Sequence, residues 1–214
     1  MRETIIGFIL AVTLVLSGCT SDSSIEKQLS ATLTKMNNAE QVYQDVQDEL
    51  TELEKTEQEL FNQTMQMTQQ QLDELKIKVA ELEELLGQRL THIEGEEKSI
   101  SKASKSVDEL DAILEQVDET SGKGLEELKS AVTNRYELHS AFVFEYKKLI
   151  SLQKELYGML IAEEVELKVL QNKVGEVNEQ NELAQLAVVA FNDATAKVNV
   201  LKDDTISNLQ KEEE

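Results

Sequence analysis

The sequence predicts an all-α protein, an elongated up-and-down antiparallel four-helix bundle with coiled-coil-like packing. The 214 residues include no proline and only eight glycines, so residues that commonly end helices are scarce. Strong helix formers, mainly Glu, Leu, Lys, Gln and Ala, dominate after residue 19. Apolar residues also recur at steps of three and four over long stretches, which is the pattern of a helical seam.

The first 24 residues precede the predicted bundle. The apolar residues 5–16 are too few to span a bilayer, which takes about 20, and they fit a secretory signal of about 7–15. Leu16-Ser17-Gly18-Cys19 follows at once and has the form of a lipoprotein signal. We expect residues 1–18 to be a cleaved signal peptide and Cys19, the only cysteine, to be lipidated. The alternative is an uncleaved anchor or a buried helix with an incidental cysteine.

Lipidation of Cys19 would set the location of the chain. One acyl chain holds a protein only marginally, whereas a diacylglycerol thioether with a further acyl group anchors it stably. The membrane is therefore a partner through these groups on Cys19, and residues 19–24 form a lipidated tether. The expected location is the outer face of the plasma membrane.

The first predicted helix begins at residue 25, where Ser23 and Glu26 are spaced for a capping box. Its apolar stripe runs to Phe61 and then stops, although residues 62–68 contain neither Gly nor Pro. A turn is expected over 62–68, and a continuous helix is the alternative. The stripe comprises Ile25, Leu29, Leu33, Met36, Ala39, Tyr43, Val46, Leu50, Leu53, Leu60 and Phe61.

The second predicted helix spans residues 66–119 and has the most regular pattern. Steps of three and four from Leu72 to Val117 give fourteen positions, and twelve are apolar. Arg89 and Glu96 occupy the other two. Either the seam opens there, or these two side chains form a polar groove or hinge that receives a partner.

Gly122 and Gly124 predict a turn over 120–124, because glycine favours the residue after a helix end. A third helix then begins at 125, and the chain reverses near 158–165. A fourth helix continues to about residue 210 and leaves 211–214 as an acidic tail. Residues 25–210 thus form one bundle without a second globular module.

The charge of the chain excludes several partners. It carries 42 Asp and Glu against 21 Lys and Arg, a net charge of −21. Nucleic-acid binding needs a basic face, so no nucleic acid is expected. Anionic polymers are repelled unless divalent cations bridge the two surfaces.

No catalytic, cofactor or metal site is predicted. His92 and His139 lie on different helices without Cys or His partners at zinc spacing, so we expect a surface histidine and a satisfied seam histidine. Pairs such as Glu83-Glu84 and Glu163-Glu164 are expected to be solvated. No nucleophile triad or phosphate-binding loop can be placed, and the protein is therefore predicted not to be an enzyme.

Three short patches of the chain carry a family resemblance. The first patch is Ala39 to Tyr43 with Gln47, Leu50, Leu53, Glu54, Glu57, Leu60 and Phe61. The second is Arg135, Tyr136, Tyr146, Leu156 and Tyr157. The third is Phe191, Asn192, Thr195, Asn199 and Lys202. Together the three patches resemble the YkyA-like cell-wall-binding lipoproteins of Gram-positive bacteria, which usually have Tyr where this chain has Val198.

The resemblance implies a four-helix fold and an extracytoplasmic lipoprotein, and it supplies no catalytic residues. The sequence therefore predicts a non-enzymatic lipoprotein that contacts peptidoglycan or another envelope protein. The alternative is a scaffold for an envelope protein or complex, without direct wall binding. Its predicted partner surface comprises Arg89, Glu96, Phe191, Asn192, Thr195 and Asn199.

Overall fold

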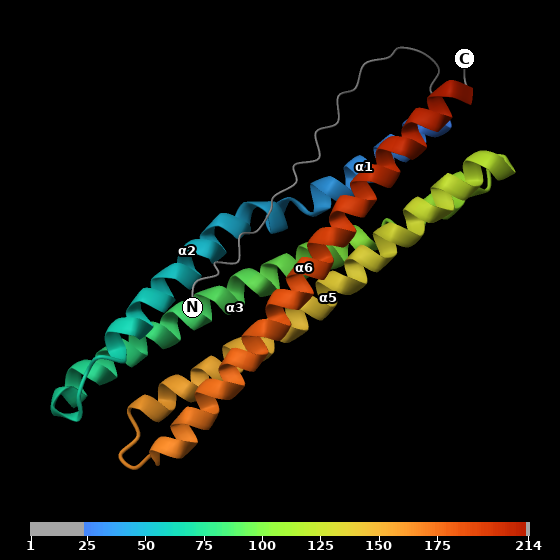
Figure 1. Cartoon of the computed structure of the whole chain (residues 1–214). Coiled ribbons are helices and arrows are strands. Elements are labelled where there is room, and N and C mark those ends of the chain that lie inside the picture. The colour runs from blue at the N-terminus through green and yellow to red at the C-terminus, as the bar shows by residue number, and fades with distance from the viewer. Residues whose placement is uncertain (1–23, 213–214) are drawn as a thin grey trace. The chain divides into compact units, whose positions relative to one another are not determined.

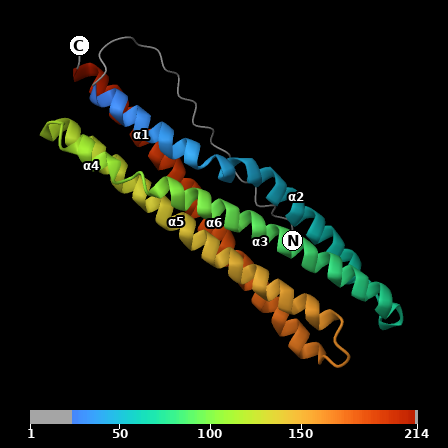
Figure 2. The same ribbon diagram turned by 180° about the vertical axis from the view of Figure 1, so that it is seen from behind.

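The computed structural model describes residues 24–212, and nearly all of them are helical (Figure 1). The helices are α1 (Ile25–Ala39), α2 (Gln41–Thr64), α3 (Leu72–Ser104), α4 (Glu109–Leu114), α5 (Glu119–Leu160) and α6 (Leu167–Glu212). A 3₁₀ turn, η1 (Gln69–Gln71), precedes α3. No strand occurs within residues 24–212, which confirms the all-α prediction (Figure 2).

The helices group into two compact units, and each unit joins segments that are far apart in the sequence. Unit 1 contains Asp45–Gly95 and Ala141–Ala187, and the described part of unit 2 is 24–44, 96–140 and 188–212. Helices α2, α3, α5 and α6 contribute residues to both units. The sequence predicts a single bundle over 25–210 and gives no sign of this division.

Unit 1 is built from two helical hairpins, α2 with α3 and α5 with α6. Side-chain contacts give the direction of the second hairpin. Gln180 on α6 bonds the carboxylate of Glu145 on α5 at 2.6 Å, and Lys173 bonds Glu155 at 2.8 Å. Residue numbers rise along one helix as they fall along the other, so the pair is antiparallel. The core of unit 1 includes Leu75, Val79, Leu82, Leu86, Ile93, Val143, Leu149, Ile150, Leu156 and Ala184.

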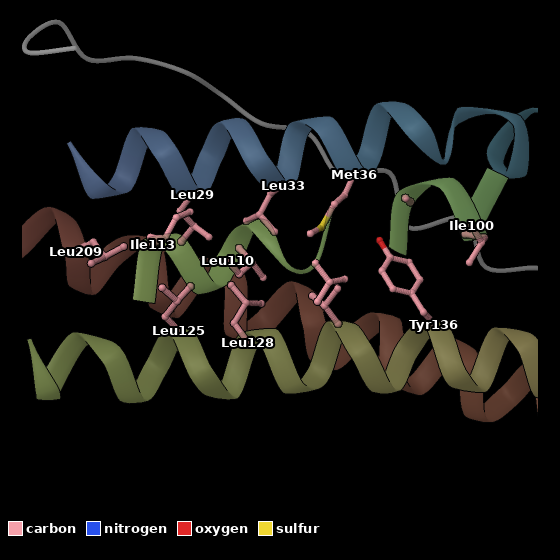
Figure 3. Packing of buried hydrophobic residues seen from close by; sticks show 13 residues of the cluster. Leu29, Leu33, Met36, Ile100, Leu110, Ile113, Leu125, Leu128, Tyr136 and Leu209 are labelled. Atoms are coloured by element: carbon pink, nitrogen blue, oxygen red, sulfur yellow. The ribbon is translucent and has the colours of Figure 1, made fainter. Parts of the chain in front are cut away.

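Unit 2 has an apolar core to which α1, α3, α4, α5 and α6 contribute. Figure 3 shows side chains of α1 directed toward those of α5, with residues of α3 and α4 in the same layer. The spacing of these residues follows the helical repeat, as the sequence predicts. The cluster comprises Leu29, Leu33, Met36, Ile100, Ala103, Val107, Leu110, Ile113, Leu125, Leu128, Val132, Tyr136 and Leu209.

Helix α1 begins at Ile25 as expected, but its N-cap lies one residue after the predicted cap. Ser24, and not Ser23, is the N-cap, and its hydroxyl accepts a hydrogen bond from the backbone N–H of Lys27 at 3.3 Å. That hydroxyl satisfies one of the backbone donors that the first turn of a helix leaves unpaired. Ser23 lies outside the described residues.

Two predicted turns are confirmed. Helix α2 ends at Thr64 and α3 begins at Leu72, within one turn of the expected reversal at 62–68. Helix α5 ends at Leu160 and α6 begins at Leu167, which agrees with the reversal predicted near 158–165.

A break between α1 and α2 at Glu40 has no counterpart in the apolar stripe of the sequence. The backbone N–H of Glu40 bonds the carbonyls of Met36 and Asn37, each at 3.1 Å. The hydroxyl of Ser99 donates to the carbonyl of Ala39 at 2.8 Å. These bonds satisfy backbone groups at the end of α1 although neither Gly nor Pro is present. The Ser99 hydroxyl, which comes from α3, supplies the donor for the carbonyl of Ala39.

The predicted second helix, 66–119, is also interrupted. Residues 105–108 separate α3 from α4, and short-range backbone bonds such as Ser106 N–H to Ala103 O at 3.0 Å tighten this segment. Ser101, Ser104 and Ser106 lie in or just before this segment, and serine side chains compete for backbone groups in helices. The apolar stripe nevertheless continues, because Val107 and Leu110 remain buried.

The turn predicted at 120–124 is wrong. Gly122 and Gly124 lie inside α5, and the chain reverses before Glu119. Asp118 fixes the start of α5, because its carboxylate accepts the backbone N–H of Ser121 at 2.9 Å. The glycines are therefore helical residues and not the turn.

The C-terminal helix extends beyond its predicted end. Helix α6 continues to Glu212, so residues 211 and 212 of the expected acidic tail are helical. Among the helices of the described chain, none is both long and apolar enough to cross a membrane. Residues 1–23, with the predicted signal peptide and tether, are outside the described part.

Candidate functional site

Polar side chains inside unit 1 form a network around Arg89. The guanidinium of Arg89 on α3 donates through Nη1 to Oε2 of Glu57 on α2. The same nitrogen bonds Gln153 Oε1 at 3.1 Å, and Nε bonds the hydroxyl of Tyr146 at 2.9 Å. Only 3 % of Arg89 and 2 % of Glu57 is exposed, so both charges are away from water.

The second carboxylate oxygen of Glu57 is satisfied by α5. Tyr157 donates its hydroxyl to Glu57 Oε1 at 2.5 Å, and Gln153 donates its amide to the same oxygen at 3.1 Å. Every oxygen of this buried carboxylate thus has a donor, as a buried charge requires. We call this set the Arg89 network, and it comprises Arg89, Glu54, Glu57, Tyr146, Gln153 and Tyr157.

The Arg89 network contains two carboxylates, Glu54 and Glu57, and one arginine. Tyr146 donates its hydroxyl to Glu54 Oε1, and Nη2 of Arg89 lies 3.6 Å from that oxygen. Burial raises the pKa of Glu54, and the nearby Arg89 charge offsets only part of that shift. Burial also raises the pKa of Tyr146 and Tyr157. The hydroxyls therefore stay protonated and act as donors.

Unit 2 has an equivalent arrangement, which we call the Glu40 network, formed by Glu40, Arg135, Tyr136 and Thr195. Arg135 on α5 makes a two-pronged ion pair with Glu40, with N–O distances of 2.8 and 2.7 Å. Tyr136 donates to Glu40 Oε1 at 2.8 Å, and Arg135 Nε bonds Thr195 Oγ1 on α6 at 2.9 Å. This network holds the break between α1 and α2 against α5 and α6.

A histidine and a carboxylate are buried beside the Glu40 network. His139 Nε2 lies 2.7 Å from Glu96 Oε1, and 1 % of His139 and none of Glu96 is exposed. The His139 ring packs edge-on against Phe191 and Tyr43, at centroid distances of 5.1 and 6.1 Å. Burial raises the pKa of Tyr43 to about 12, and the charge of Glu96 adds to the effect.

These groups are chemically able to transfer protons, but their surroundings favour a structural role. General acid or base chemistry needs a group within reach of a substrate proton. The acids, bases and arginines of both networks instead bond one another between packed helices. Within residues 24–212, no group of three or more His, Cys, Asp and Glu side chains could hold a metal ion.

The structure corrects the predicted partner surface at three positions. Arg89, Glu96 and Phe191 lie in the interior, where each contacts residues of other helices. The seam therefore neither opens at Arg89 and Glu96 nor forms a groove there. Both side chains are retained inside because a buried partner of matching chemistry, Glu57 or His139, faces each of them.

The other predicted surface residues lie on α6 and are partly buried. Thr195 accepts from Arg135 and donates to the carbonyl of Phe191 at 3.0 Å. The amide nitrogen of Asn199 is buried without a hydrogen-bond partner. Asn192 is half-buried. Cys19 lies outside the described residues, so its lipidation stays a prediction.

The expected roles of the two histidines agree with the structure. His139 is a satisfied seam residue, and His92 is a partly exposed residue with Glu49 at 3.6 Å. Glu83, Glu84, Glu163 and Glu164 are exposed, as predicted for solvated faces.

The partners of Arg89 and Glu96 were not predicted from the seam pattern. Glu57 sits in the step between Leu53 and Leu60, and Glu40 follows Met36 by one turn, so both are seam positions. Arg135 lies next to Tyr136, a seam residue of the third predicted helix. Charged residues at or beside the seam are therefore the signal in the sequence for buried ion pairs, and the packing of the helices decides which of them pair.

The fold and its interior define an all-α helical protein whose core is fixed by buried ion pairs. A crystal structure of a conserved protein of unknown function from Staphylococcus aureus has the same fold. It superposes with a TM-score of 0.72 at 19% identity, covering 89% of this chain and 97% of that one.

The chain belongs to the YkyA family, described as "Putative cell-wall binding lipoprotein", whose pattern matches residues 24–208. It is similar to the uncharacterized lipoprotein YkyA of Bacillus subtilis strain 168. The two are 27% identical over 203 residues, which is 93% of this chain and 89% of the relative. The resemblance inferred from the three sequence patches is therefore confirmed.

Proposed function

We propose that the protein is a non-enzymatic, lipid-anchored envelope protein that binds the cell wall. Family membership over residues 24–208 is the observation that carries this proposal. In this proposal Cys19 carries the diacylglycerol and acyl groups, and the chain sits on the outer face of the plasma membrane. The helical region then supplies the binding surface.

The chemistry of the interior supports a binding role over catalysis. The charged residues of the Arg89 and Glu40 networks have partners inside the helical units, with N–O distances such as 2.7 and 2.8 Å in the Arg135–Glu40 pair. Breaking such pairs to reach a substrate would leave a buried charge unpaired, at a cost of about 3–5 kcal/mol. Binding must therefore use the exposed faces.

The charge of the chain sets the conditions for wall binding. At a net charge of −21, contact with an anionic polymer requires bridging cations. The test is sedimentation of the purified protein with isolated cell wall, with and without Ca²⁺. Cosedimentation that increases with Ca²⁺ is the expected result. Absence of the protein from both pellets would refute wall binding.

The second candidate function is a scaffold for another envelope protein, without direct wall contact. Its support is the set of large apolar side chains that lie exposed, among them Leu167 and Val169 of α6 and Leu186 further along the same helix. Crosslinking in intact cells distinguishes the two functions. One dominant protein adduct supports the scaffold, whereas adducts with wall fragments alone support wall binding.

A further inference from the structure

The middle of α6 contains ten consecutive residues, 183–192, without a charged side chain. One side of this stretch belongs to the core, since none of Ala184 and only 1 % of Phe191 is exposed. A helix at a protein surface normally has a polar outer face, and a helix that is apolar all round is normally buried all round. The outer side of residues 183–192 is therefore the unusual part of this helix.

That outer side exposes three large apolar residues on one face. Leu183 is 47 % exposed, Leu186 is 67 % exposed and Val189 is 54 % exposed. Successive members are three residues apart, so each is turned by only about 60° from the one before, and neighbouring members lie on the same face. The residues between them are Ala, Gln and Val, and none is charged. We call Leu183, Leu186 and Val189 the α6 apolar patch.

Carboxylates border the α6 apolar patch at both ends. Each residue of the patch has a carboxylate four positions away along the helix, which is a neighbouring position on the same face. Glu179 and Glu182 stand before the patch or at its edge, and Asp193 stands after it. All three are exposed, and none has an ion-pair partner among residues 24–212. The nearest lysine on this face is Lys197, about one turn beyond Asp193.

An exposed apolar patch with a polar border is typical of a protein interaction site. We propose that the α6 apolar patch binds a basic amphipathic helix of another envelope protein. Apolar side chains of that helix would cover Leu186 and its two neighbours in the patch. Its Lys or Arg residues would pair with Glu179, Glu182 and Asp193. A second copy of this chain fits less well, because it would bring three more carboxylates to the contact.

This proposal rests on the scaffold function and is independent of wall binding. The cell-wall sedimentation experiment can therefore fail without affecting it. If crosslinking in cells gives a dominant protein adduct and the peptide experiment below fails, the scaffold function stands and the α6 apolar patch is not its surface.

Binding of fluorescent helical peptides to the purified full-length protein, measured by anisotropy, tests the proposal. One peptide has a leucine face bordered by lysines, and the matched peptide has glutamate at every lysine position. Leu186→Ser/Val189→Ser should weaken binding of the lysine peptide by about tenfold or more. The control Ile77→Ser/Phe144→Ser alters side chains that are each 60 % exposed on α3 and α5. It should bind within about twofold of the natural chain.

A second pair of variants separates the patch from the general acidity of the chain. Glu179→Gln/Glu182→Gln should weaken binding of the lysine peptide by about fivefold. Glu163→Gln/Glu164→Gln removes the same charge in the turn before α6 and should change binding by less than about twofold. All four variants alter exposed residues, so their unfolding midpoints should match that of the natural chain.

The proposal is overturned if the lysine peptide does not bind, or if the α6 variants bind it as well as their controls do. It is also overturned if the glutamate peptide binds equally well. Dimers in sedimentation that Leu186→Ser/Val189→Ser dissociates would likewise overturn it, because the patch would then be occupied by a second copy.

Discussion

At the scale of single residues, two arginines inside the helical units determine which substitutions the protein tolerates. Arg89 and Arg135 each pair with one glutamate, and a tyrosine hydroxyl donates to the same carboxylate. The carboxylate depends on both donors, because Glu57 and Glu40 are buried away from bulk solvent. Removal of one member leaves the others buried and unpaired.

Arg89→Leu should destabilise the protein by about 3–5 kcal/mol, because Glu57 would remain as an uncompensated buried charge. Urea unfolding followed by circular dichroism measures the change. Glu57→Gln combined with Arg89→Leu should recover part of the loss. The surface pair Lys78–Glu81 provides the control, since Lys78→Leu should change stability by less than about 1 kcal/mol. A higher unfolding midpoint for Arg89→Leu would contradict the network.

The four tyrosines should resist ionisation in the folded protein. Burial raises the pKa of Tyr43 to about 12 and also raises the pKa of Tyr136, Tyr146 and Tyr157. Because the folded pKa exceeds the unfolded value of about 10, this stability is present below pH 10 and is lost as pH rises through 12. Absorbance titration at alkaline pH should show no phenolate until the helices melt. A transition near pH 10 with intact helices would contradict the structure.

Glu54 should make stability depend on pH on the acid side. Its folded pKa is raised above the ordinary 4.5, so its proton is held more tightly in the folded chain. Its contribution to stability is therefore greatest at low pH and is lost as pH rises through the folded pKa. Relative to the natural chain, Glu54→Gln should be more stable at about pH 8 than at about pH 5. An identical difference at both pH values would show that the pKa is unshifted.

At the scale of helices, the start of α5 depends on Asp118 and not on glycine. Asp118→Ala should destabilise the protein by about 1 kcal/mol through loss of the cap to Ser121. Gly122→Ala should instead stabilise it by about 0.5–1 kcal/mol, because alanine is the better helix former. A methyl group there would meet Val117 at 3.5 Å, an ordinary contact. Thermal unfolding of the two variants checks both signs, and a destabilised Gly122→Ala would place the turn at the glycines.

The helical stripes could be predicted from the sequence, because a seam repeats with the helix itself. Leu82, Ile93 and Leu110 follow the predicted steps and are fully buried. The break at Glu40 could not be predicted, since its hydrogen bonds come from Ser99 and Arg135 on other helices. The same distinction between the helical repeat and contacts from other helices applies to the candidate site. Arg89 and Glu96 stand out as polar seam residues, but their partners depend on how the helices pair.

At the scale of the whole molecule, the interior and the exposed surfaces have different roles. In each unit a buried network of arginine, glutamate and tyrosine joins the helices, and in the proposed function the exposed faces serve recognition. The predicted lipid on Cys19 would place these faces outside the membrane, where both a wall polymer and an envelope protein are available. Both proposed functions, wall binding and scaffolding, therefore depend on the lipid anchor at Cys19.

Mass spectrometry of the protein extracted from membranes tests this claim most directly. The natural chain should begin at Cys19 and carry a diacylglycerol group with a further acyl group. The Cys19→Ala variant should retain residues 1–18 and incorporate no fatty acid. A natural chain that keeps residues 1–18 and bears no lipid on Cys19 would contradict lipid anchoring.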